Sequence, residues 1–139
     1  MLTLKEIRDY IASLGIVSKD YAYIGKLDNK KQKSIGVYSR SGSGPPGIAL
    51  GGPDCSTYDT KRVSLLIHWT KSKDEAERAA CALFEKLRNV SSLNIGDTHI
   101  DYLRLMVPEP QDVGTDDDGV YEYVIWLDFL YERTGEQHG

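Results

Sequence analysis

The stretch that most constrains the fold lies at residues 61–87, where one periodicity gives way to another. Its first half alternates apolar and mixed side chains, which predicts a strand with one buried face. Its second half repeats apolar residues at helical spacing, and Ser72 and Glu75 precede this stripe at the spacing of a capping box. A buried strand that passes straight into an amphipathic helix predicts a sheet with a helix packed on it. The strand set is Val63, Leu65, Ile67 and Trp69 on one side and Ser64, Leu66 and His68 on the other, and the helix set is Ala76, Ala79, Ala80, Leu83, Phe84 and Leu87.

Size and charge limit the class of protein. With 139 residues, 40% of them apolar, the chain is long enough for one domain with its own core. A net charge of −4 argues against a protein that binds nucleic acid by sequence, because phosphate binding needs clustered Lys and Arg. No long apolar run or targeting segment is visible, so we expect no membrane partner and synthesis in a reducing cytoplasm. Cys55 and Cys81 are too few for a zinc motif or a disulfide scaffold, and Cys81 is expected in the core.

The N-terminal part predicts one helix and two strands. Residues 1–14 carry apolar residues at helical spacing, and Thr3 with Glu6 again has capping-box spacing. Two extended segments follow on either side of a polar turn. We expect them to pair as a β-hairpin from about Tyr21 to Ser39.

Residues 40–60 are rich in glycine and proline and contain no pattern of a regular element. A loop of this length inside a small domain is usually functional or disordered. Ile48 and Leu50 form an apolar knob in its middle. Two interpretations remain open: the knob packs on its own core, or it docks on another subunit.

The C-terminal part predicts two long strands, at residues 98–107 and 120–131, that pair as a hairpin around an acidic loop at residues 111–119. The expected fold class is therefore α+β: a mostly antiparallel sheet with two helices on one face, in the order α-β-β-β-α-β-β. We expect a single domain over residues 1–132 and a disordered tail at residues 133–139.

The last predicted strand is apolar on both faces. Tyr123, Ile125 and Phe129 alternate with Val124, Trp126 and Leu130. A strand of this kind needs cover on both sides, and two helices on one face supply only one. The second cover is either another layer of the same chain or another subunit.

The search for a catalytic, cofactor-binding or metal-ligating set finds none. The histidines are not at metal-ligand spacing, and the glycine-rich loop lacks the Lys-Ser/Thr of a phosphate loop. His68 alternates with core positions, which favours a packed structural side chain. The aspartates Asp116, Asp117 and Asp118 favour a solvated turn over a calcium loop. We therefore expect no enzyme, no cofactor and no metal.

Three stretches resemble tail-completion proteins of long-tailed bacteriophages, and more specifically their tail terminators. They are the opening helix TLKEIRDYIASLG, the segment YDTKRVSLLIHWTKSKDEAERAACALFEKL and the closing strand GVYEYVIWLDFLYER, which with their order cover most of the chain. The resemblance implies a structural virion protein of the head–tail joining region, a minor capsid component made in the bacterial host cytoplasm. It also implies a homo-oligomeric ring, a hexamer, that caps the tail tube protein and presents a surface to the head connector protein.

On this interpretation two groups of residues take part in assembly. We assign subunit or partner contacts to Ile48, Leu50, Tyr58, Trp126 and Leu130. The acidic loop residues Asp116, Asp117 and Asp118 are expected to face the ring lumen, where negative charge would repel DNA phosphates.

Two other functions compete with the virion protein. One is a small soluble α+β module that binds a peptide or a small molecule outside a virion. The other is an enzyme whose site combines scattered residues such as His68, Asp101 and Tyr102. Association into a species of several copies, or binding to tail tubes, separates the first function from both.

Overall fold

The protein is an α+β fold, as the sequence predicts. The computed structural model describes residues 2–25, 31–40 and 58–132, without the side chains of Tyr58 and Glu132. The elements in these residues are α1 (Leu4–Ser13), the short 3-10 turn η1 (Lys19–Tyr21), β1 (Ala22–Ile24), β2 (Ser34–Ser39), β3 (Tyr58–His68), α2 (Lys73–Arg88), β4 (Leu93–Ile95), β5 (Thr98–Leu105), β6 (Gln111–Thr115) and β7 (Tyr121–Glu132).

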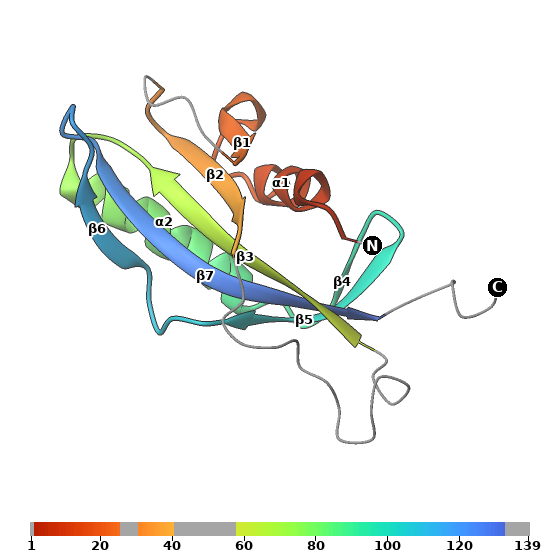
Figure 1. Cartoon of the computed structure of the whole chain (residues 1–139). Helices are drawn as coiled ribbons and strands as arrows, with labels where there is room; N and C mark the ends of the chain where they lie inside the picture. Colours follow the sequence, from red (N-terminus) through yellow and green to blue (C-terminus); the bar gives the residue numbers. More distant parts are fainter. Residues whose placement is uncertain (1, 26–30, 41–57, 133–139) are drawn as a thin grey trace.

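The described strands form one sheet with β3 and β7 at its centre. The strand order is β1-β2-β3-β7-β5-β4, and β6 also pairs with β7. β3 pairs with one edge of β7 along its whole length. β6 and β5 pair with the other edge, β6 near the start of β7 and β5 near its end. Every pairing is antiparallel except β1 with β2. Figure 1 shows β3 and β7 side by side as the longest strands, with α2 behind the sheet.

One face of this sheet carries the hydrophobic core. Leu65 on β3 lies opposite Ile125 on β7, and both are fully buried. Buried residues of both helices, among them Ile7, Ile11 and Leu83, belong to the same core cluster. Both helices therefore pack on one face, as predicted from their number, which is too small to cover both faces.

The caps explain where the helices begin. Thr3 accepts a hydrogen bond from the Glu6 amide, and the Glu6 carboxylate accepts one from the Thr3 amide, which completes the predicted capping box of α1. At α2, Ser72 accepts from the Glu75 amide, but the Glu75 carboxylate turns to the hydroxyl of Thr70 instead. The second cap is thus only half of the predicted box.

The structure corrects the predicted pairing near the N-terminus. The expected hairpin from Tyr21 to Ser39 is wrong, because β1 and β2 are parallel, with Ala22 opposite Ile35. Alternation identifies extended segments but contains no information on their relative direction. The residues on either side of the connection, Gly25 and Lys33, have positive φ angles of 70° and 54°.

Two short strands were also missed. The residues before β5 form β4, which pairs with β5 through a turn at Gly96, where φ is 58°. Part of the expected acidic loop is the strand β6, whose five residues are all exposed. β6 has no apolar alternation because it pairs at an exposed edge, and β4 is only three residues long, too short for its alternation to mark a strand.

The predicted position of Cys81 is also wrong. Its side chain is exposed on α2, between the buried Ala80 and the exposed Ala82. Partial burial, together with the neighbouring carboxylates of Glu77, Glu109 and Glu85, raises the pKa of its thiol. The apolar face of α2 includes Ala80 and Leu83 but not position 81. Cys81 therefore faces solvent, although free cysteine is usually buried.

Candidate assembly surface on the open sheet face

The second face of the sheet carries no helix in the described structure. Its residues alternate along each strand with those of the core, so register determines which side chains meet there. We call this surface the open face. Its larger apolar side chains are Tyr38, Leu66, Tyr102, Met106, Val124, Trp126 and Leu130.

Trp126 is the centre of the open face. It lies opposite Ser64 on β3, and Ser64 lies opposite Tyr38 on β2. On the other side its carbonyl accepts a hydrogen bond from the Met106 amide. Trp126 is 46% exposed, and so are Tyr102 and Met106. Several large apolar side chains on a face that no described element covers make this surface a candidate site of interaction with another protein.

A row of charges crosses four strands beside Trp126. Arg62 on β3 lies opposite Asp128 on β7, and Arg104 on β5 lies opposite Asp128 on its other side. Arg40, just after β2, donates its amide to the Arg62 carbonyl and so continues the row. We call Arg40, Arg62, Asp128 and Arg104 the arginine row.

Asp128 is the buried centre of the arginine row. Its carboxylate is 2% exposed and accepts from Arg40 Nη2 at 2.7 Å and from Arg104 Nη2 at 3.2 Å. The Arg40 guanidinium also lies 5.7 Å from the centre of the Trp126 ring, within the range of a cation–π contact. Three arginines and one aspartate leave the row with two positive charges in excess. This row therefore joins the aromatic surface to a local positive charge in an acidic protein.

The opposite end of the open face has a separate polar cluster. His68 is fully buried, its Nδ1 lies 2.9 Å from a Glu122 carboxylate oxygen, and its Nε2 lies 3.7 Å from a carboxylate oxygen of Asp116. Asp116 belongs to the turn between β6 and β7, which lies over His68 at this end. The cluster fixes that turn to the sheet, so His68 has the packed structural position that we predicted.

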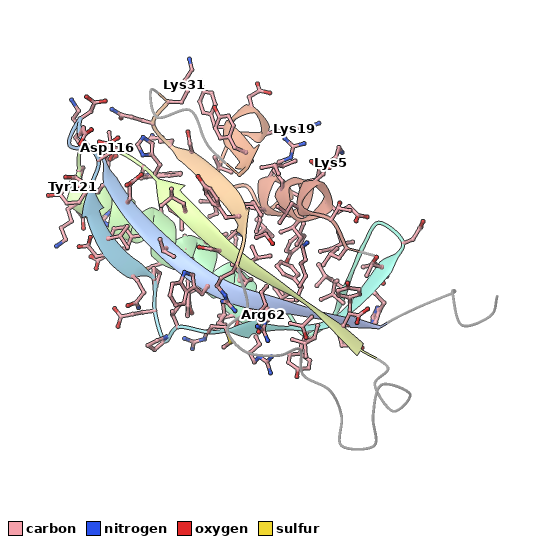
Figure 2. All side chains as sticks on the ribbon, viewed as in Figure 1. Lys5, Lys19, Lys31, Arg62, Asp116 and Tyr121 are labelled. Carbon is pink, nitrogen blue, oxygen red and sulfur yellow. The ribbon has the colours of Figure 1, made fainter. Side chains whose placement is uncertain are left out.

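The three aspartates of the turn have different environments. One Asp116 carboxylate oxygen accepts from the amides of Asp118 and Val120, each at 2.9 Å. Asp116 is partly buried, whereas Asp117 and Asp118 are exposed. We call Asp116, Asp117 and Asp118 the acidic turn. Figure 2 shows Asp116 and Arg62 at well-separated positions along the sheet.

The predicted contact residues can be placed only in part. Trp126 and Leu130 both lie on the open face, where Leu130 is half-buried opposite Tyr102. Ile48, Leu50 and the side chain of Tyr58 lie outside the described residues, as do most of the loop at 40–60 and the tail at 133–139.

The residues of the alternative enzyme site are not brought together. Along β3, His68 and the position opposite Leu130 are eight residues apart, which is about 26 Å of strand. Since Tyr102 is next to Leu130, it lies far from His68. In the described parts of the chain, no group of three or more metal-ligating side chains occurs.

A pocket of about 370 Å³ lies between the start of α2 and β6. Lys73 and Asp112 form an ion pair across it at 3.3 Å. The Gly114 amide and Lys73 lower the pKa of Asp112, and Asp112 in turn raises the pKa of Lys73. The two charges thus satisfy each other.

Sequence reasoning missed the arginine row because its members lie far apart in the chain. Arg40, Arg62 and Arg104 stand in three different strands or strand ends, and no motif links them. One signal was available: Asp128 interrupts the apolar set of the last strand, between Trp126 and Leu130. A charge at such a position predicts a buried partner.

The open face has the composition of a protein–protein contact surface. The chain matches the family model of the bacteriophage tail terminator protein over residues 10–133 and therefore belongs to that family. Membership makes it a structural component of the virion that interacts with other phage proteins. A comparison with curated proteins finds no match. In the described residues, no helix is long and apolar enough to cross a membrane.

Proposed function

We propose that this protein caps the tail tube as a ring and presents a surface to the head connector, with six copies in the ring. The observation that supports the proposal is the open face, where Trp126 is 46% exposed beside the arginine row with its buried Asp128. A helix-free face of this composition needs cover that the described chain does not supply.

A closed ring uses a heterologous contact, in which two different patches of each subunit meet. We assign Trp126 and Leu130 to these contacts because they lie on the open face. Ile48, Leu50 and Tyr58 remain proposed contact residues from the sequence. On this view the chain is made in the host cytoplasm and joins the head–tail region during assembly.

The ring also offers two positions for the acidic turn. In the lumen, negative side chains would repel DNA phosphates during passage. Asp116 is engaged with the sheet, so this role falls to Asp117 and Asp118. The interface with the neighbouring subunit is the competing position.

Electron microscopy of the purified chain mixed with tail tubes of its phage tests the proposal. We expect added density at one end of each tube and a species of several 15.6-kDa chains at high concentration. The variant Trp126→Ser should lose tube binding while it keeps its thermal unfolding midpoint. The variant Ile24→Ala is the matched control, because Ile24 is 45% exposed but lies on the edge strand β1.

A chain that stays monomeric at every concentration and ignores tail tubes would contradict the proposal. That result would favour a small binding module in its place.

A further inference from the structure

We propose that the arginine row is the receptor for the acidic turn of an adjacent copy of this chain. This inference rests on the proposed ring and specifies its subunit contact. One subunit then contributes Arg40, Arg62 and Arg104, and its neighbour contributes Asp117 and Asp118.

The arginine row has unused capacity to donate hydrogen bonds. Among the described residues, Arg62 makes no ion pair, and the buried Nη1 of Arg40 has no acceptor. The partly exposed Arg62 and the 48% exposed Arg104 can donate to a docking carboxylate, whose geometry matches a guanidinium. The single carboxylate of Asp128 is already shared between Arg40 and Arg104. The row therefore fits an acidic ligand.

The acidic turn is the complementary patch. Within the described structure, Asp117 and Asp118 are exposed and take part in no ion pair. The turn is held in shape by Asp116, which accepts from two backbone amides and lies against His68. A turn fixed in this way loses little conformational entropy on docking.

The turn and the row of one subunit cannot meet. Asp116 lies beside the pair His68–Glu122, and the row is centred on Asp128, six residues further along β7. This spacing corresponds to about 20 Å of strand. Complementary patches that are apart on one molecule can meet only between molecules.

The charges limit the symmetry of the contact. A two-fold axis through the row would bring two positive rows together, which is unfavourable, whereas an axis midway between row and turn would pair each row with the partner's turn. A head-to-tail contact joins unlike charges and can close into a ring. The exposed aromatic side chains Trp126 and Tyr102 flank the row and supply the apolar area of such an interface.

A second copy fits this surface better than DNA. The excess of positive charge is confined to one row, whereas a phosphate backbone is bound by a longer basic stripe. The chain as a whole carries a net charge of −4, which opposes a nucleic acid but supplies acidic partners for the row.

Charge reversal on both patches tests the contact. The row variant Arg62→Glu and the turn variant Asp117→Lys with Asp118→Lys should each assemble on tail tubes only at roughly ten to a hundred times the wild-type concentration. An equimolar mixture of the two variants should recover assembly, because in an alternating ring the introduced glutamate faces the introduced lysines, and the remaining contacts are those of the wild type. One chain that carries all three changes should recover it as well.

The control reverses charges outside both patches. Lys19 and Asp20 are exposed on η1, and Lys19→Glu with Asp20→Lys should assemble as the wild type does. Circular dichroism checks that each variant is folded. If Arg62→Glu does not fold, Arg104→Glu replaces it, because the Arg104 side chain is 48% exposed.

The outcomes separate this inference from the proposed function. If wild-type protein caps tubes but neither the mixture nor the combined variant recovers assembly, the contact is wrong and the capping function stands. If the wild type never binds tubes, the proposed function itself fails. If Arg62→Glu assembles normally but no longer retains a labelled DNA duplex that the wild type binds, the row is a nucleic-acid site and the inference is overturned.

Discussion

The two faces of the β3–β7 pair are built from neighbouring residues of the same strands, yet they have opposite environments. Leu65 is fully buried under the helices, and Leu66, the next residue, is only partly buried on the open face. The covered face holds the fold together through apolar burial. The open face combines aromatic side chains with a charged row and is available to partners. On the proposed function, one strand serves stability with one set of residues and assembly with the other.

The largest expected effect tests this division directly. Leu65→Ala should lower the free energy of unfolding by about 2–5 kcal/mol, because it leaves a cavity in the core. Leu66→Ala, the matched change on the open face, should cost only about 1 kcal/mol because less area is buried. Chemical denaturation of both variants measures the difference. Equal losses would mean that the open face is covered in the monomer by another part of the chain.

The second effect concerns the buried charge of the open face. Asp128→Ala should cost about 2–3 kcal/mol, because Arg40 loses its carboxylate in a partly buried site. Arg104→Ala should cost about 0–1 kcal/mol, since its side chain is 48% exposed. Urea unfolding curves separate the two values. A neutral Asp128→Ala would show that the row does not contribute to the stability of the monomer.

A third, smaller effect tests the helices that cover the core. Thr3→Ala should cost about 1 kcal/mol, because it removes the hydroxyl of a complete capping box. Ser72→Ala should cost less, since the Ser72 hydroxyl accepts from Glu75 at 3.3 Å and no return bond completes that cap. Thermal unfolding of both variants makes the comparison. The reverse order would show that α2 depends more on its cap than α1.

The smallest effect lies at the exposed edge strand β6. The Asp112 carboxyl should titrate below its ordinary pKa of 3.8, because the Gly114 amide and then Lys73 favour its charged form. A lowered pKa stabilises the fold above the ordinary value, and this contribution is lost as the pH falls through the folded pKa. Carbon-detected NMR of the carboxyl group follows the titration.

A lysine substitution separates the two causes. Lys73→Met should raise the pKa of Asp112 only part of the way back to its ordinary value of 3.8, because the hydrogen bond from the Gly114 amide remains. Lys71→Met is the control, since Lys71 is exposed and, within the described residues, forms no ion pair. A complete return to 3.8 in Lys73→Met would show that the ion pair alone lowers the pKa of Asp112.

Much of the architecture could be predicted because its signals are local. The alternation at residues 63–69 and the stripe after Ser72 correctly predicted β3, α2 and the face on which they meet. The parallel direction of β1 relative to β2 could not be predicted, because the residue pattern of neither strand depends on it. Exposed β6 could not be predicted either, since a strand without a buried face has no apolar alternation.

The candidate site was predicted only through its apolar members. Trp126 and Leu130 were identified because they occupy the second face of a strand that is apolar on both sides. The three arginines of the neighbouring arginine row come from three other parts of the chain. Only the pairing of β3 with β7, and of β7 with β5, places Arg62 and Arg104 on either side of Asp128.

The sequence alone determined which segments are helices and long strands, and which side chains of β3 and β7 share a face; in β5 a bulge between Ile100 and Tyr102 breaks the alternation. These properties follow from the geometry of the single chain, in which side chains repeat every two or 3.6 residues. Tertiary structure decided which strands are neighbours, and thereby gathered the charges of the open face into one row. The physical reason is that strand register joins residues far apart in sequence, and no local period encodes that choice.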